Sequence, residues 1–195
     1  MMNAIRAPLV VSLMLIPFVL LSLKSIGYLS GLGANPVEAI IHEMGLWGIR
    51  FLMLTLLITP IAYYSGNRSI AKLGKPVGLM AFFYVLNHFL SYAIIDQAGD
   101  LAVIIVDIIE TPYLIVGWGG FLCLLGVASV SFKRLESWFN QNRSTISGLV
   151  YIATILGVWH FYWQTKVIEV EPLLYSVILL FLIVWRFKIT WGMKK

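Results

Sequence analysis

Residues 77–95 read VGLMAFFYVLNHFLSYAII and contain no Asp, Glu, Lys or Arg. At about 1.5 Å of rise per residue, a helix over this stretch is about 28 Å long, close to the thickness of the hydrocarbon core of a bilayer. An uncharged apolar run of this length is typical of a transmembrane helix. We therefore predict that this stretch crosses a membrane and that His88 lies inside it.

Five further apolar runs approach the same length. They cover residues 7–23, 44–64, 113–132, 147–165 and 173–187. A shorter run at 101–109 contains Asp107 and is predicted to be an interfacial or loop helix, because it is too short to span. The run at 7–23 has no signal-peptidase-like site after it, so we expect a retained helix. The expected fold is all-α, a polytopic bundle of six transmembrane helices in one integral-membrane domain over residues 1–195.

The composition of the 195-residue chain agrees with this fold class. Hydrophobic residues make up 60% of the chain and charged residues 12%, against about 45–50% and about 25% in soluble domains. A water-soluble domain of this size could not bury so much apolar surface. This argues against a soluble enzyme, a disordered chain, a secreted disulfide scaffold and a nucleic-acid binder. Cys123 is the single cysteine and is interpreted as a packing residue.

The charged residues predict the direction of the spans. Basic residues near the span ends gather on one side: Arg6, Arg68, Lys72, Lys75, Lys133, Arg134, Arg143, Arg186, Lys188, Lys194 and Lys195. The other side has Lys24 and Lys166 together with most of the acidic residues: Glu38, Glu43, Asp96, Asp100, Asp107, Glu110, Glu169 and Glu171. By the positive-inside rule, both termini are expected in the cytoplasm. This topology, with some contact to anionic lipid, accounts for the net charge of +5 without nucleic acid.

Three ionisable side chains, His88, His160 and Arg50, are predicted to lie inside the membrane, where such residues are costly and usually functional. The helical rise places all three about 8–10 Å from the outer ends of their spans. Two histidines at one depth on two helices can supply both axial ligands of one b-type haem. Arg50 could then pair with a haem propionate.

Flat and small neighbours of the histidines are the other predicted cofactor contacts. Tyr84 and Tyr92 lie four residues on either side of His88, while Gly157 and Trp163 lie three residues on either side of His160. Residues at these spacings share a helical face.

Each of these residues also has a plainer interpretation. A membrane histidine can hydrogen-bond a neighbouring helix, Arg50 can pair with Glu43 or extend toward the interface, and aromatic rows often serve packing or the interfacial belt. His42 is interpreted as a solvated or capping residue at the outer rim. Asn35, Pro36 and Glu38 could instead open a short amphipathic segment that carries it.

Several short segments carry a family resemblance over about residues 31–187. They are GLGANPV at 31–37, His42 with Gly45, RFL at 50–52, LLITP at 56–60, Gly78-Leu79, His88 with SYA at 91–93, TPY at 111–113 with Gly117, Val150-Tyr151, and His160 with Trp163 and Lys166. In this order and spacing, the chain resembles the haem-binding membrane subunit of the bacterial periplasmic methionine-sulfoxide reductase system (the MsrQ family, formerly YedZ). That family is part of the ferric-reductase-like transmembrane group.

The resemblance implies a six-helix b-type cytochrome of the inner membrane. Such proteins pass electrons from the quinone pool or a cytoplasmic flavin reductase to a periplasmic molybdopterin methionine-sulfoxide reductase, and FMN binding is also described for them. His88 and His160 fall on two of the family's haem histidines. The third falls on Ser147, within RSTIS at 143–147, and a basic pair before the third span is reduced to Gly74-Lys75.

The position of Ser147 affects the number of haems. The thirteen residues from 147 to 160 cover about 20 Å of helix, which is the layout of two stacked haems across a bilayer. Serine is not a normal haem ligand, so the sequence is compatible with a single outer haem, a different inner ligand or a changed electron donor.

We therefore expect an electron-transfer subunit rather than a stand-alone enzyme. Its metal ligands would be His88 and His160. Two alternatives stay open: a haem-free assembly or interaction subunit with the same fold, and a small proton or metal transporter. The sequence shows no nucleotide-binding motif and no internal repeat of the transporter kind.

Overall fold

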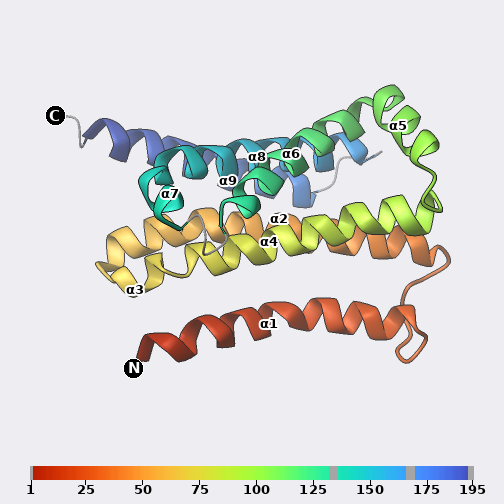
Figure 1. Ribbon diagram of the computed structural model, residues 1–195, viewed down its shortest axis with the longest axis horizontal. Coiled ribbons are helices and arrows are strands. Elements are labelled where there is room, and N and C mark those ends of the chain that lie inside the picture. Colours follow the sequence, from red (N-terminus) through yellow and green to blue (C-terminus); the bar gives the residue numbers. More distant parts are fainter. Residues whose placement is uncertain (1, 132–135, 166–169, 193–195) are drawn as a thin grey trace.

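A computed structural model describes residues 2–131, 136–165 and 170–192 of the protein. The helices are α1 (Met2–Ser25), α2 (Pro36–Ser65), α3 (Arg68–Ala71), α4 (Gly74–Leu90), the π-helix η1 (Ser91–Asp96), α5 (Leu101–Glu110), α6 (Pro112–Ser129), α7 (Glu136–Gln141), α8 (Arg143–Gln164) and α9 (Val170–Gly192). The long helices run side by side along one axis, with α5 at one end of the bundle and α3 and α7 at the other (Figure 1).

Within these ranges, six stretches are long and apolar enough to cross a membrane. They contain α1, α2, α4, α6, α8 and α9. The all-α fold with six spans is therefore confirmed, and the short helix predicted at 101–109 is α5. The first residue of α1 and the last residue of α9 lie at the same end of the bundle (Figure 1). Which side of the membrane that end faces stays a prediction.

Some residues used in the sequence predictions lie outside the described residues. They are Phe132, at the end of the predicted span 113–132, and the charged residues Lys133, Arg134, Lys166, Glu169, Lys194 and Lys195.

The second span begins earlier than the predicted position 44. Asn35 is the N-cap of α2, and its side-chain oxygen accepts a hydrogen bond from the Glu38 main-chain N–H at 3.3 Å. Pro36 occupies the first helical position, where its missing N–H costs nothing. The possible separate segment around His42 is therefore the first part of one continuous helix.

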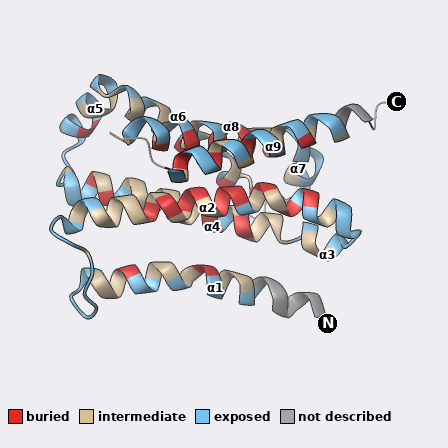
Figure 2. Ribbon diagram, turned by 180° about the vertical axis from the view of Figure 1, so that it is seen from behind, coloured by how far each residue is buried: buried red, intermediate tan, exposed pale blue. Residues whose placement is uncertain are grey.

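The buried core lies among α2, α4, α6 and α8. Leu52, Ala81, Leu124 and Ala153 each come from a different one of these helices and belong to one cluster of buried side chains. Gly48 allows α2 and α4 to approach closely, because a Cβ there would lie 2.8 Å from Val85 Cγ2. Buried residues concentrate along the central helices, while the outer faces carry exposed apolar side chains suited to lipid (Figure 2).

One tyrosine attaches α1 to this core. The Tyr84 hydroxyl donates to the Met14 carbonyl at 2.7 Å and accepts from the Phe18 main-chain N–H at 2.9 Å. The Tyr84 ring is fully buried and makes an edge contact with Phe51 of α2. The hydroxyl thus joins α4 to the first helix in a region where water cannot replace the bonds.

We predict that Tyr84→Phe lowers the stability of the folded protein. Removal of the hydroxyl deletes both bonds, and losses of this kind cost about 1–2 kcal/mol. Thermal unfolding in detergent should show a lower midpoint for this variant. Tyr28→Phe is the control, since Tyr28 is 78% exposed. Equal midpoints for Tyr84→Phe and the wild type would contradict the assigned role.

Candidate functional site

Two predicted residues, His88 and His160, are brought together by the fold. His88 lies on α4 and His160 on α8, and their ring centroids are 6.1 Å apart with an interplanar angle of 77°. Both side chains line one cavity between the helices. A metal ion held between two imidazole nitrogens at about 2 Å from each separates the ring centroids by about 6 Å, so the rings fit a shared metal.

Each histidine is held by a main-chain carbonyl of the neighbouring helix. His88 Nδ1 lies 2.8 Å from the Ile41 oxygen on α2, and His160 Nδ1 lies 2.8 Å from the Tyr113 oxygen on α6. A carbonyl oxygen can only accept, so each Nδ1 carries the hydrogen. Each Nε2 therefore keeps its lone pair, which is the protonation state that a metal-binding imidazole needs.

A glycine packs against each imidazole on its carbonyl side. A Cβ at Gly45 would lie 3.0 Å from His88 Nδ1, and a Cβ at Gly117 would lie 2.8 Å from His160 Nδ1. Any larger residue would push the ring away from its carbonyl. These two glycines therefore fix how closely each ring approaches its neighbouring helix.

The two halves of this arrangement are copies of one unit. In both, the carbonyl precedes its histidine by 47 residues. The histidines are 72 positions apart (160 minus 88), and so are Ile41 and Tyr113, and Gly45 and Gly117. The pairs α2–α4 and α6–α8 follow in the same order along the chain, so this is a direct repeat.

The cavity between the two pairs has a volume of about 380 Å³. Leu52 and Leu124 line it, and polar side chains line it as well: Asn35, Glu38, His42, Tyr92, Asp96, Asp107 and Gln164. Of the predicted contacts, Tyr92 and Gly157 line it. The Tyr92 hydroxyl donates to Asp107 of α5 at 2.6 Å.

Three predicted contacts do not line the cavity, and we remove them from the proposed site. Tyr84 instead bonds α1, as described above. Trp163 is 47% exposed and stacks on Trp159 at 5.8 Å, so it lies on the outer surface.

Arg50 is the third. Its guanidinium forms an ion pair with Glu171 of α9 at 2.8 Å and donates to the Tyr175 hydroxyl at 3.1 Å. The paired acid is thus Glu171 rather than Glu43, and the ion pair joins α2 to α9. The depth of Arg50 in its span did not show which helix lies opposite its side chain.

The sequence interpretation missed His42. This side chain lies within α2, half-buried, with its ring centroid 6.0 Å from that of Phe161, and it lines the cavity. It is therefore neither a loop residue nor a cap. The signal was its spacing of three residues from Gly45, which places both on one helical face.

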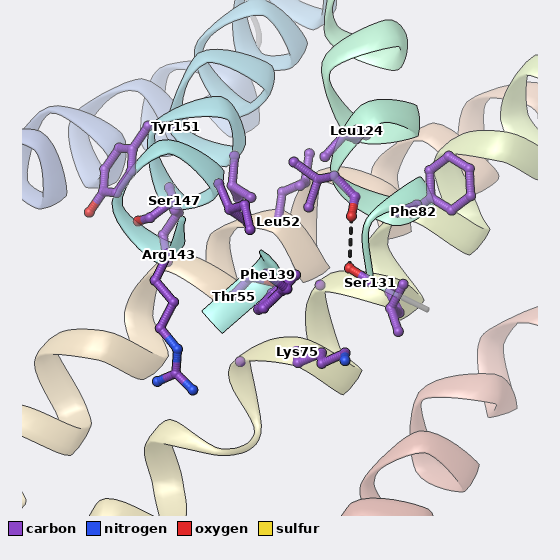
Figure 3. A pocket seen from close by; sticks show the side chains of 18 of the residues that line it. Leu52, Thr55, Lys75, Phe82, Leu124, Ser131, Phe139, Arg143, Ser147 and Tyr151 are labelled. Atoms are coloured by element: carbon purple, nitrogen blue, oxygen red, sulfur yellow. Dashed lines mark hydrogen bonds between the residues drawn. The ribbon is translucent and has the colours of Figure 1, made fainter. Parts of the chain in front are cut away.

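A second cavity lies in the part of the bundle toward α3 and α7, with a volume of about 170 Å³ (Figure 3). It is lined by Lys75 of α4, Arg143 and Ser147 of α8, and apolar residues of α2 and α6. Ser147 accepts a hydrogen bond from Arg186 of α9. Leu52 and Leu124 line both cavities.

Comparisons with known proteins identify the family. Residues 44–165 match the family described as ferric reductase like transmembrane component. The chain is 36% identical over 161 residues to the protein-methionine-sulfoxide reductase heme-binding subunit MsrQ of Brucella ovis, which covers 83% of this chain and 73% of the relative. It is 37% identical over 155 residues to the protein of the same name from Xanthomonas oryzae pv. oryzae, which covers 80% and 71%. The chain is therefore a multi-pass inner-membrane protein that belongs to the ferric reductase like transmembrane family and, within it, to the MsrQ family.

Proposed function

We propose that this protein is the haem-binding, electron-transferring membrane subunit of a protein-methionine-sulfoxide reductase system, and that His88 and His160 hold one haem b. The printed name of the relatives, a heme-binding subunit, supports the cofactor. The observation that supports this site is the pair of imidazole rings whose centroids lie 6.1 Å apart. Each ring donates a hydrogen bond from Nδ1 to a main-chain carbonyl. A bound haem iron supplies one-electron oxidation and reduction.

The residues around the histidines set the conditions for that chemistry. The two carbonyls orient the rings and increase the basicity of each Nε2. Gly45 and Gly117 hold the rings at a fixed distance from α2 and α6. Gly157 has no side chain that would take up space in the cavity. His42 and Gln164 also line the cavity, and their side chains can donate hydrogen bonds to the carboxylates of a cofactor.

The charges at the two ends of the bundle support a topology for this proposal. Arg68, Lys72 and Arg143 lie toward the α3 and α7 end, while Asp96, Asp100 and Glu110 belong to the η1 and α5 end near the histidines. With the basic end in the cytoplasm, the histidine cavity lies in the outer half of the membrane. Electrons then arrive from quinol or a cytoplasmic flavin reductase and leave to a periplasmic molybdopterin methionine-sulfoxide reductase. FMN stays a prediction from the resemblance.

We predict that His88→Ala and His160→Ala each remove the haem, to below about a tenth of the wild-type content, because one axial ligand is lost. The measurement is a reduced-minus-oxidised absorbance spectrum with haem quantified per polypeptide. Asn87→Ala is the matched control, since Asn87 is next to His88 and bonds the Phe83 carbonyl of its own helix. Full haem in the double histidine variant would refute the ligand assignment, and a colourless wild type would favour the haem-free alternative.

Gly117→Ala is predicted to weaken haem retention about tenfold, as changes behind a metal-binding histidine do. The added methyl would lie 2.8 Å from His160 Nδ1 and displace the ring from the Tyr113 carbonyl. Gly126→Ala, also on α6, is the control because nothing lies within 4 Å of a Cβ there. Haem loss during gel filtration reports the effect, and equal loss from the two variants would contradict it.

The predicted topology can be tested with fusions at the C-terminus. Green fluorescent protein is expected to fluoresce there and alkaline phosphatase to be inactive, since a cytoplasmic C-terminus follows from the positive-inside rule. The opposite pair of results would place the histidine cavity in the inner half of the membrane.

A further inference from the structure

One carboxylate, that of Asp107 on α5, is bonded to both halves of the repeat. Its Oδ2 accepts a hydrogen bond from the Tyr92 hydroxyl at 2.6 Å, and its Oδ1 accepts one from the Thr111 hydroxyl at 3.0 Å. Tyr92 follows His88 by four residues, in η1. Thr111 is the N-cap residue of α6, the helix that orients the other histidine. The carboxylate thus connects the segment after one predicted ligand to the helix that holds the other.

The local structure on both sides directs a donor to this carboxylate. Tyr92 lies in the π-helix η1, where its carbonyl accepts from the Gln97 N–H, five residues later, at 3.0 Å. Such wide turns occur frequently at functional sites. A threonine at an N-cap usually bonds the first turn of its own helix. The Thr111 side chain makes no such bond to α6 and donates to Asp107 instead.

These bonds fix α5 at the wall of the histidine cavity. The helix lies at one end of the bundle, between η1 and α6 along the chain (Figure 1). Two of its residues, Asp107 and Ile108, line the cavity. A haem held by the two histidines would therefore have the Asp107 carboxylate in the wall around it.

Burial distinguishes Asp107 from the other carboxylates that line this cavity among the described residues. Glu38 and Asp96 are exposed, so water and salt screen their charges, whereas Asp107 is half-buried. The described lining contains no lysine or arginine that could neutralise it. The charge of Asp107 therefore acts on the cavity through a medium less polar than water, where charges interact more strongly.

The repeat offers a comparison for this position. Asn35 stands 72 positions before Asp107 (107 minus 72) and also lines the cavity. Asn35 is a neutral amide that caps α2 and donates to the Glu38 carboxylate at 2.9 Å. One unit of the repeat is thus built with an uncharged side chain here and the other with a carboxylate. The fold of the unit does not require the negative charge, so we looked for its effect on the cofactor.

We propose that Asp107 lowers the reduction potential of the haem held by His88 and His160. The proposal rests on the proposed function, which supplies the haem. Ferric haem carries one more positive charge than ferrous haem, so a nearby carboxylate stabilises the ferric form. Tyr92 and Thr111 are positioning residues, because their hydrogen bonds hold the carboxylate at the cavity wall. Asp107 thereby makes it easier for the reduced site to pass one electron to its acceptor.

The test measures the midpoint reduction potential of the haem by spectroelectrochemical titration of the full-length protein in detergent. Asp107→Asn is expected to raise the potential, because it removes the charge. The equilibrium constant between ferric and ferrous haem should shift about threefold to tenfold, which is about 28–59 mV for one electron. Glu110→Gln is the matched control: it removes a carboxylate from the same helix, but Glu110 is exposed and does not line the cavity. Its potential should equal that of the wild type.

The sign of the shift separates the charge of Asp107 from its structural role. Tyr92→Phe removes one hydrogen bond and keeps the charge. A loosened wall that admits water favours the more highly charged ferric form, so this variant should leave the potential unchanged or lower it. A rise in Asp107→Asn that is absent from Tyr92→Phe and Glu110→Gln supports the proposal.

Other results would overturn it. An unchanged or lower potential in Asp107→Asn, or an equal rise in Tyr92→Phe or Glu110→Gln, would show that the Asp107 charge does not set the potential. Asp107→Ser is a second uncharged variant and must raise the potential as well, which keeps the test decisive if the amide impairs haem retention. Haem content is measured on the same samples, and a wild type without haem would reject the proposed function instead.

Discussion

The hydrogen bond between a histidine Nδ1 and a main-chain carbonyl of another helix is the constraint on which the rest of this bundle depends. His88 and Ile41, and His160 and Tyr113, each meet at 2.8 Å. Such a bond requires two helices to approach within one side chain of each other, which is why Gly45 and Gly117 face the rings. The spacing of α2 from α4, and of α6 from α8, is thereby set at the histidine rings, and the cavity lies between the two pairs of helices.

The membrane helices could be predicted from the sequence because the length of an apolar run is a local property. The spans at 77–95 and 113–132 needed no knowledge of neighbours. The start of α2 at Pro36 depended on a cap by Asn35 that hydropathy does not register. Tyr84 and Trp163 were predicted at the cofactor from helical spacing, and Arg50 from its depth, and neither property identifies the neighbouring helix. Their partners, Met14, Trp159 and Glu171, are determined by tertiary packing.

In the predicted site, too, local sequence properties could be predicted and tertiary contacts could not. His88 and His160 could be paired in the sequence by their similar depth, and the family resemblance implies that Ser147 stands where relatives have a histidine. That Arg186 contacts Ser147, 39 residues earlier in the chain, required the fold. The repeat is weak in the sequence because few of its positions keep their identity: Gly45, Gly48, Leu52 and His88 recur at 117, 120, 124 and 160, while most others differ.

This direct repeat has a consequence for any cofactor with unlike edges. A cavity with two walls built alike does not by itself distinguish a flat porphyrin from the same molecule turned over, so two orientational isomers would be close in energy. Several counterpart positions of the cavity lining differ, among them Tyr92 and Gln164, Val85 and Gly157, and His42 and Leu114. Only Tyr92 is tied to α5, through Asp107. A cofactor bound in this cavity would therefore meet different side chains on its two faces, and one of these differences depends on the short interfacial helix.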